Sequence, residues 1–308
     1  MTLAFIACVE RGYLEEQTLL LCRSIRRYAG RFSASAIYTF QPRCGTEVTP
    51  RTLALFDQLG VFHNTETLNT DFEDYGYGNK IFACARAEET LSEDVLVFLD
   101  SDTIMTGEPV DLDLPDEVYA AAKPAHSFFL NSTGPEDPND AYWQKVYEAS
   151  GIEARPFVET ELGRRVRAYF SSGLVAVRRE AGLFRQWKKD FLRLVNAELI
   201  PEGTGVSRMD EVSLAALLTR AFDRVRILDG RYNYLIYRRS QLGSPWREAR
   251  LEDLVHVHYR HWFNEKNFLR QVEPPLDPTS EILQWLDQYL PFDDRAIPFA
   301  RSGKVVAV

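Results

Sequence analysis

The sequence has few cysteines, no excess of basic residues and no long apolar run. Its 308 residues include only four cysteines, which are scattered and form no Cys-x-x-Cys pair. This usage is typical of reduced thiols in a cytoplasmic protein. The formal net charge of −9 lacks the basic footprint that a nucleic-acid partner requires. No segment approaches the roughly 20 consecutive apolar residues of a membrane span. We therefore expect a cytoplasmic protein with no nucleic-acid partner and no membrane span.

The order of apolar segments predicts an α/β fold. Continuous apolar runs at residues 3–9, 34–40 and 95–99 alternate with helix-like spacing at residues 13–28, 52–59 and 82–91. Such runs are typical of parallel strands that are buried on both faces by flanking helices. Residues 1–105 therefore form a nucleotide-binding type of α/β half in this prediction.

The rest of the chain has a looser, mixed pattern. Strand-like runs occur at residues 169–177, 225–228 and 254–259, and helices are expected at 182–199, 210–221 and 282–290. Residues 106–117 and 131–140 are rich in Pro, Asp and Gly, which indicates surface loops. No fixed-period repeat and no clear linker divides the chain. We therefore predict one domain over residues 1–308, with a mixed second half at 106–270 and a helical tail at 271–308.

An acidic pair follows the most apolar of these strands. The run at residues 95–99 leads directly into Asp100-Ser101-Asp102. Residues i and i+2 of an extended segment point to the same side, so both carboxylates can converge on one point. Open α/β sheets bind their ligands at the carboxyl ends of parallel strands. Two hard oxygen ligands there suit Mg²⁺ or Mn²⁺, which could in turn hold a diphosphate.

A histidine pair occurs on a late apolar strand. His256 and His258 share one face of the segment at residues 254–259, and imidazole is a common metal ligand. We predict that one of the two binds metal. A self-contained zinc site is the weaker alternative, because no thiolate or third histidine lies at zinc spacing.

With these motifs in order, the chain resembles a GT-A type glycosyltransferase, and is most similar to the glycogenin-related retaining enzymes of family 8. The resemblance covers most of residues 3–265. Asp100-Ser101-Asp102 resembles the Asp-x-Asp motif with which this family holds Mn²⁺ and the diphosphate. The family completes the metal site with a histidine on a late strand. The resemblance therefore implies the ligands Asp100, Asp102 and His256, with His258 as the fallback.

The resemblance also implies a set of donor-binding residues. Residues 5–9 look like the family's first strand, whose backbone contacts the base, and the tyrosine that follows lies over the base ring. A lysine and an arginine within residues 80–86 occur where related enzymes face the donor phosphates. The implied set is Ala7, Cys8, Val9, Tyr13, Lys80, Arg86 and Ser101.

Two later motifs depart from the family pattern. Residues 169–175 are similar to its Phe-Asn-Ser-Gly strand, with Ser171 in place of the asparagine. Asp210 and Glu211 resemble its Asp-Gln pair at a helix start, with Glu211 in place of glutamine. An acidic residue there also suits the positive end of a helix. The family's Lys-Pro-Trp segment is absent, which leaves Arg260 and Lys266 as candidates for its phosphate contact.

The resemblance thus implies a GT-A Rossmann-like fold and a metal-dependent, hexosyltransferase-like enzyme that retains anomeric configuration. The implied donor is a UDP-sugar, the cofactor Mn²⁺ or Mg²⁺, and the acceptor a carbohydrate or glycoconjugate bound by residues 106–270. The metal would stabilise the leaving diphosphate, and a carboxylate could stabilise or attack the oxocarbenium-like sugar. The catalytic hypothesis is that Asp210 positions the donor sugar and Glu211 lies near its anomeric carbon.

Two other functions are compatible with parts of the sequence. An apolar strand that ends in Asp-x-Asp is also typical of haloacid-dehalogenase-like phosphatases, in which Asp100 would be the nucleophile. That family places Thr or Val where this chain has Ile104, and its motif lies near the N-terminus. A non-catalytic sugar-nucleotide-binding protein is the second alternative, because Ser171 and Glu211 depart from the transferase pattern.

The remaining arginines and aromatics have simpler interpretations. The arginine clusters at residues 164–167, 178–179 and 238–239 are interpreted as solvated faces. Trp246, Tyr259 and Trp262 are candidates for stacking on an acceptor sugar, with core packing as the equal alternative.

Overall fold

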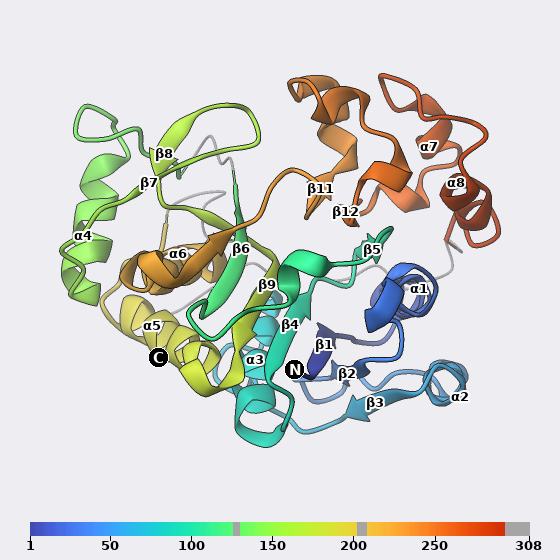
Figure 1. Cartoon of the computed structure of the whole chain (residues 1–308). Helices are drawn as coiled ribbons and strands as arrows, with labels where there is room; N and C mark the ends of the chain where they lie inside the picture. Colours follow the sequence, from blue (N-terminus) through green and yellow to red (C-terminus); the bar gives the residue numbers. More distant parts are fainter. Residues whose placement is uncertain (126–129, 202–207, 293–308) are drawn as a thin grey trace.

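A seven-stranded sheet forms the centre of the protein (Figure 1). The structure, a computed structural model, describes residues 1–125, 130–201 and 208–292. The strand order is β10-β6-β9-β4-β1-β2-β3. The bounds are β1 (Leu3–Cys8), β2 (Ala36–Phe40), β3 (Val61–Asn64), β4 (Val95–Leu99), β6 (Ala120–Pro124), β9 (Phe170–Arg178) and β10 (Val225–Ile227). Only β9 runs antiparallel to its neighbours, β4 and β6. The prediction of a mostly parallel α/β sheet is confirmed.

Helices cover both faces of this sheet. On one face, Phe5 and Val97 pack into a core with α1 (Tyr13–Tyr28) and α2 (Pro50–Gln58). On the other face, Ile6 and Phe98 pack into a second core with α3, α4, α5 and α6. The bounds of these helices are α3 (Asn79–Thr90), α4 (Asp140–Ser150), α5 (Leu183–Asn196) and α6 (Met209–Arg220). Because successive strand residues face opposite cores, β1 and β4 are apolar at every position.

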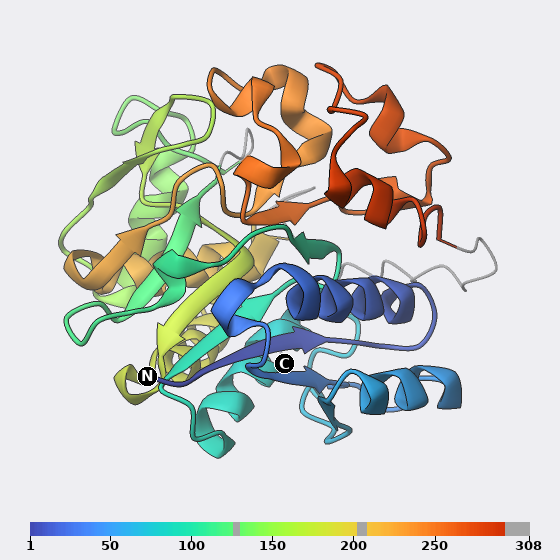
Figure 2. The ribbon, with the colours of Figure 1, turned by 45° about the vertical axis from the view of Figure 1, so that its right-hand side comes forward.

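A smaller sheet joins the acidic motif to the late histidine strand. β5 (Thr103–Met105) begins directly after Asp102 and pairs antiparallel with β12 (His256–His258). β11 (Tyr234–Leu235) completes the order β11-β12-β5. This pairing sets His258 opposite Thr103 and thereby beside the acidic pair. A third core packs against this sheet from the C-terminal elements α7 (Phe268–Gln271) and α8 (Glu281–Leu286), seen above the central sheet in Figures 1 and 2.

The helix at residues 13–28 and the strand at residues 95–99 have the predicted bounds. The sequence pattern did not predict β3, β6 or α4, nor the hairpin of β7 (Phe157–Glu159) and β8 (Arg165–Arg167). In the predicted tail at residues 271–308, α8 is helical, α7 ends at the first residue of the tail, and residues 293–308 lie outside the described part. No helix in the described ranges is long and apolar enough to cross a membrane. All four cysteines are unpaired, as expected.

Candidate active site

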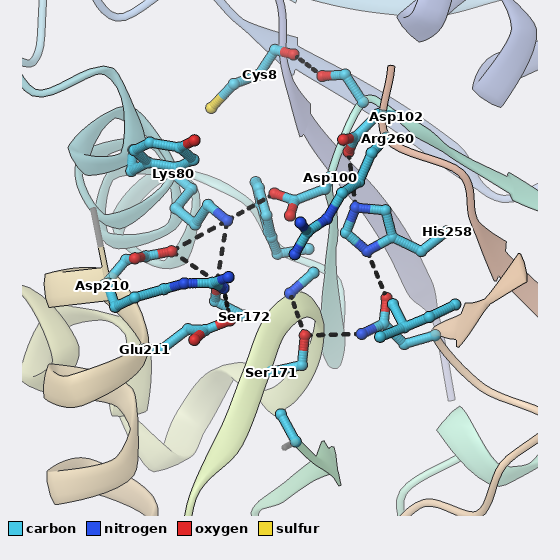
Figure 3. Close-up of a pocket in the computed structure, with 18 of the residues that line it drawn as sticks. Cys8, Lys80, Asp100, Asp102, Ser171, Ser172, Asp210, Glu211, His258 and Arg260 are labelled. Carbon is cyan, nitrogen blue, oxygen red and sulfur yellow. Dashed lines mark hydrogen bonds and ion pairs between the residues drawn. The ribbon is translucent and has the colours of Figure 1, made fainter. Parts of the chain in front are cut away.

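A cavity of about 640 Å³ opens where β1 and β4 end (Figure 3). The N-terminal half lines it with Cys8, Tyr13, Lys80 and the acidic motif, and later elements close it from other sides. The antiparallel direction of β9 matters here. Because Leu99 pairs with Leu174, the polar start of β9 lies beside the carboxyl end of β4. The backbone N–H of Asp100 donates to the Gly173 carbonyl at 3.0 Å, which ties the two strands together at the cavity.

Asp100, Asp102 and His258 converge in this cavity. One ligand atom from each lies within 4.8 Å of the other two. His258 Nδ1 lies 3.0 Å from Asn233 Oδ1, and the Asn233 amide donates to Ser171 Oγ at 2.7 Å. An amide oxygen only accepts, so Nδ1 donates to Asn233, and Nε2 lies 3.2 Å from Asp102 Oδ1. An imidazole nitrogen and carboxylate oxygens are ligand atoms that divalent metal ions accept. The three side chains therefore fit a divalent cation.

The two carboxyls of this group have different electrostatic surroundings. Burial disfavours ionisation of Asp102, but His258, Lys80 and Arg260 outweigh it and lower the pKa of Asp102 to about 2. For Asp100, burial and the neighbouring Asp102 charge raise the pKa above its usual value, against the opposing effect of Lys80. A divalent cation would relieve the repulsion between them and favour the doubly ionised pair.

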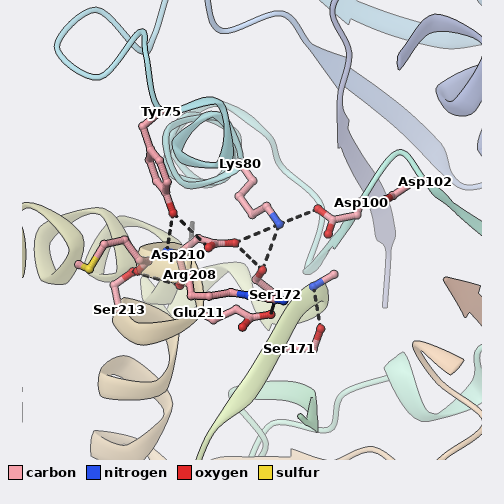
Figure 4. A network of polar contacts seen from close by, with 12 residues as sticks. Tyr75, Lys80, Asp100, Asp102, Ser171, Ser172, Arg208, Asp210, Glu211 and Ser213 are labelled. Atoms are coloured by element: carbon pink, nitrogen blue, oxygen red, sulfur yellow. Dashed lines mark hydrogen bonds and ion pairs between the residues drawn. The ribbon is translucent and has the colours of Figure 1, made fainter. Parts of the chain in front are cut away.

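Lys80 connects this group to a second acidic pair (Figure 4). Its Nζ lies 2.7 Å from Asp100 Oδ1 and 3.2 Å from Asp210 Oδ2, and it donates to Ser172 Oγ at 3.0 Å. Burial disfavours the ammonium, but the Asp100 and Asp210 charges dominate and raise the pKa of Lys80 above its usual range. Lys80 is therefore a buried cation whose donor positions are occupied by the protein itself.

Asp210 and Glu211 lie at the start of α6, where the helix dipole favours negative charge. Asp210 is 2% exposed and accepts from Ser172 Oγ at 2.6 Å and from the Tyr75 hydroxyl at 3.2 Å. Glu211 accepts a short hydrogen bond from the Tyr169 hydroxyl and one of 2.9 Å from Arg208 Nη1. Both carboxylates are thus held in fixed orientations at the cavity wall.

The structure brings His258, rather than His256, to the acidic pair. His256 pairs with Met105, two residues further along β5 than the Thr103 position that His258 occupies. It is fully buried, and neither ring nitrogen has a hydrogen-bond partner in the described part of the chain. Burial and the nearby His258 lower the pKa of His256 to about 3. The resemblance favoured His256 as the metal ligand, with His258 as the fallback. The geometry agrees with His258.

Other predicted residues divide between the cavity and its surroundings. Tyr13, Cys8 and Ser101 line the cavity, and Ser101 also donates a short hydrogen bond to the Cys8 carbonyl. Ala7 and Val9 are buried and do not line it. Arg86 lies on the outer side of α3 and pairs with Glu66 at 2.7 Å, away from the described cavity lining. A residue of the right type at the right distance in sequence is therefore not always at the site.

The prediction of solvated arginine clusters is wrong for two members. Arg167 is buried and pairs with Asp140 at 2.9 Å. Arg239 is also buried, and it donates to the Ala249 carbonyl at 2.6 Å. Arg238, the neighbour of Arg239, lines the cavity. Two adjacent arginines therefore have unrelated surroundings.

The aromatic candidates for acceptor stacking belong to the third core instead. Tyr259 is fully buried and stacks on Phe263 with ring centroids 3.7 Å apart. Trp246 and Trp262 are partly buried and pack against the same core or its rim. None of the three lines the cavity in the described residues. The packing alternative is the correct one.

Sequence reasoning also missed several cavity residues. Arg208 and Lys123 line the cavity. Tyr75 and Tyr169 donate hydrogen bonds to the carboxylates of Asp210 and Glu211. Lys123 had a detectable signal, because it is the one charged residue of the apolar strand β6. The two tyrosines had none, since they act through distant partners on α6.

Residues 5–219 match the model of a family described as the Rhodobacterales glycosyltransferase domain, which is more than half of the chain. No curated protein sequence matches the chain.

Several solved structures have a similar fold. The glycosyltransferase GlyE of Streptococcus pneumoniae TIGR4 has 16% identity and a TM-score of 0.50 over 94% of this chain and 60% of its own. The bifunctional glycosyltransferase WbbM has 14% identity and a TM-score of 0.53 over 94% and 52%. The galactosyltransferase LgtC, solved with donor and acceptor sugar analogues, has 12% identity and a TM-score of 0.50 over 97% and 98%. The chain thus spans less than two thirds of GlyE and WbbM. At these identities the likeness shows a shared GT-A fold.

Proposed function

The chain belongs to the Rhodobacterales glycosyltransferase family, and from this premise we propose a metal-dependent, retaining transfer of a sugar from a UDP-sugar to a carbohydrate or glycoconjugate acceptor. We also propose that the chain acts as one domain, because residues from Cys8 to His261 line one cavity. The observation that carries the proposal is the convergence of Asp100, Asp102 and His258 in that cavity. The family match does not favour the phosphatase alternative.

Asp100, Asp102 and His258 would hold Mn²⁺ or Mg²⁺. Two carboxylates and an imidazole are a donor set that suits Mn²⁺, and Asn233 orients the imidazole through its other ring nitrogen, as hydrogen-bond partners of metal-bound histidines usually do. When bound, the cation supplies Lewis-acid stabilisation of the leaving diphosphate. The resemblance of the chain as a whole to the retaining enzymes of family 8 supports the UDP donor and the retaining outcome.

The other cavity residues would bind and orient the donor. Tyr13 lines the cavity at the start of α1, where its ring could cover the base. Arg260 lines the same cavity, and its charge lowers the pKa of Asp102. Of the two candidates for the diphosphate contact, Arg260 and Lys266, Arg260 is therefore the stronger. Arg86 is not part of this proposal, because it faces away from the cavity.

Asp210 and Glu211 would act on the sugar. The bonds from Ser172, Tyr75 and Lys80 keep Asp210 in one orientation, which suits a residue that positions donor hydroxyls. Glu211 lies at the cavity as a carboxylate that Arg208 stabilises. Such a group can stabilise positive charge at the anomeric carbon or attack that carbon.

Thermal-shift measurements with UDP, GDP, ADP and their sugars, each with and without Mn²⁺, test the donor site. We expect one diphosphate to stabilise the wild type only with Mn²⁺, and Asp102→Ala to abolish this shift. Asp71→Asn is the matched control, because Asp71 and Glu73 have the same acidic spacing on an exposed loop. No metal-dependent shift with any nucleotide would reject the proposal.

Glu211→Gln tests catalysis, and with it the alternative of a non-catalytic binding protein. Removing the charge that faces the developing cation should lower the rate of donor hydrolysis about 100-fold or more, while the UDP–Mn²⁺ shift remains. Glu159→Gln, at the exposed end of strand β7, is the control. Full activity of Glu211→Gln would exclude this role for Glu211, and a wild type that binds the donor without hydrolysing or transferring it would indicate a binding protein.

A further inference from the structure

Three charged side chains of the cavity have no role in the proposed function. Lys123 comes from β6, Glu161 from the turn between β7 and β8, and Arg238 from the 3₁₀ helix η7 (Ile236–Gln241). All three line the same cavity as the acidic group. They come from separate segments, so the fold brings them together rather than a local sequence motif.

Each of the three has unfilled hydrogen-bonding capacity. Lys123 is 5% exposed, and within the described ranges its Nζ makes one hydrogen bond, to the Asn233 carbonyl at 3.2 Å. Arg238 Nη1 and Glu161 Oε2 are buried and have no hydrogen-bond partner among the residues that the structure describes. Buried polar atoms of native proteins are paired in the great majority of cases. Two such atoms and one singly bonded ammonium around the same cavity indicate that a polar ligand completes them.

The balance of charge favours an anionic ligand. Burial and the nearby Arg238 lower the pKa of Lys123, whereas Glu161 and Asp229 oppose this effect from a distance. Neither Lys123 nor Arg238 forms an ion pair in the described ranges. Arg208, Arg238 and Arg260 all act on the phenol of Tyr237, whose ring lies 5.0 Å below the Arg260 guanidinium. Arg208 is paired with Glu211, so the positive charge that remains on this side of the cavity comes from Arg238 and Arg260.

We propose that Lys123 and Arg238 bind a carboxylate or phosphate group of the acceptor glycan, while Glu161 accepts a hydrogen bond from an acceptor hydroxyl. This inference rests on the proposed function, because it names the acceptor class of the same site. A guanidinium matches the planar geometry of a carboxylate or phosphate, and the ammonium adds a point charge. Lys123 donates a hydrogen bond to the backbone carbonyl of Asn233, and the side chain of Asn233 orients His258. A single residue, Asn233, therefore contacts both the proposed anion site and the proposed metal site.

The test compares sugars that differ in charge. The pairs are methyl glucoside with methyl glucuronide, methyl galactoside with methyl galacturonide, and glucose with glucose 6-phosphate. Each is titrated by calorimetry with and without UDP and Mn²⁺. At least one acidic sugar should bind about 10-fold to 100-fold more tightly than its neutral partner, because a hydrogen bond to a charged group is worth that much. The first two pairs report a carboxylate and the third a phosphate.

Two variants localise this preference. Arg238→Gln and Lys123→Met should each reduce the ratio of acidic-sugar to neutral-sugar affinity towards one. Methionine is chosen at position 123 because it keeps the buried aliphatic part of the lysine side chain. Arg247→Gln is the matched control, because Arg247 is an exposed arginine outside the cavity lining. This control should retain the wild-type ratio.

The outcomes separate the two proposals. Equal binding of every pair, or a preference that survives in both variants, overturns the anion site. Loss of the UDP–Mn²⁺ shift in Arg238→Gln also overturns it, because Arg238 would then belong to the donor site. If the wild type shows no shift with UDP and Mn²⁺, the proposed donor chemistry fails, and the ratios measured without nucleotide still decide the anion site.

Discussion

The two halves of the cavity treat buried positive charge differently. On the side of the acidic motif, Lys80 lies between the carboxylates of Asp100 and Asp210, with Ser172 as a third partner. On the side of β6 and η7, Lys123 has one backbone carbonyl as its hydrogen-bond partner and Arg238 has no ion pair in the described part of the chain. A buried ion pair is largely balanced within the folded protein, whereas an unbalanced charge costs stability until a ligand neutralises it. The charge of Lys80 is therefore balanced within the folded protein, whereas in our proposal a bound anion balances Lys123 and Arg238.

Removal of the balanced cation should have the largest effect. Lys80→Met leaves two buried carboxylates without their counter-charge, and breaking such a pair typically costs about 3–5 kcal/mol. We expect a loss of that size in the free energy of unfolding, measured by urea denaturation at neutral pH. Mn²⁺ should recover part of it, because the cation would compensate Asp100. Lys145→Met, at an exposed position of α4, should change stability by less than about 0.5 kcal/mol. A similarly small change for Lys80→Met would contradict the comparison.

A second balanced pair, outside the cavity, should show a smaller and pH-dependent effect. Burial disfavours ionisation of Asp140, but bonds from Arg167, Ser132 and Gln144 outweigh it and lower the pKa of Asp140 to about 2. The folded pKa is thus below the unfolded value of about 3.9. The contribution of about 2 kcal/mol is present above that unfolded value and is lost as pH falls towards 2.

Thermal unfolding between about pH 5 and pH 2 measures this contribution. Asp140→Asn should be less stable than the wild type at pH 5, and the difference should shrink as the pH falls. Asp137→Asn is a useful comparison, because Asp137 also has a lowered pKa but is only partly buried and bonds to loop residues. A constant difference between wild type and Asp140→Asn across this range would mean that Asp140 acts by packing alone.

The unbalanced cation should give the smallest effect, with the opposite sign. Lys123→Met removes a buried charge that forms no ion pair with the residues that the structure describes, and it keeps the aliphatic contacts of the side chain. We expect the free energy of unfolding to stay within about 1 kcal/mol of the wild type, or to rise. Urea denaturation alongside Lys80→Met gives the direct contrast. A loss as large as that of Lys80→Met would show that the protein itself balances Lys123.

The central elements were predictable because their signals are local. The strand at residues 95–99 is apolar at every position, and the acidic pair follows it directly. Asp210 and Glu211 were also recognisable, since they occur together at a helix start. These features depend on neighbours in the sequence, so a pattern in a short window is enough to find them.

The choice between the two histidines was not predictable in this way. His256 and His258 have the same alternation, and only the pairing of β12 with β5 shows which of them lies beside Asp102. The same limit applies to Arg238 and Arg239, whose surroundings are set by distant residues such as Ala249. The polar part of the cavity depends on tertiary register, which the apolar pattern does not contain.

Gly173 shows how little room this arrangement leaves for change. A Cβ placed on it would lie 2.9 Å from Asn233 Oδ1 and 3.0 Å from His258 Nδ1, which are the two atoms that orient the imidazole. Any larger residue would therefore turn the histidine away from the acidic pair. For protein engineering, this position must be kept constant in libraries that aim at new acceptors. Diversity belongs instead at Glu161 and Arg238, where the cavity wall can vary without moving the groups proposed to hold the donor.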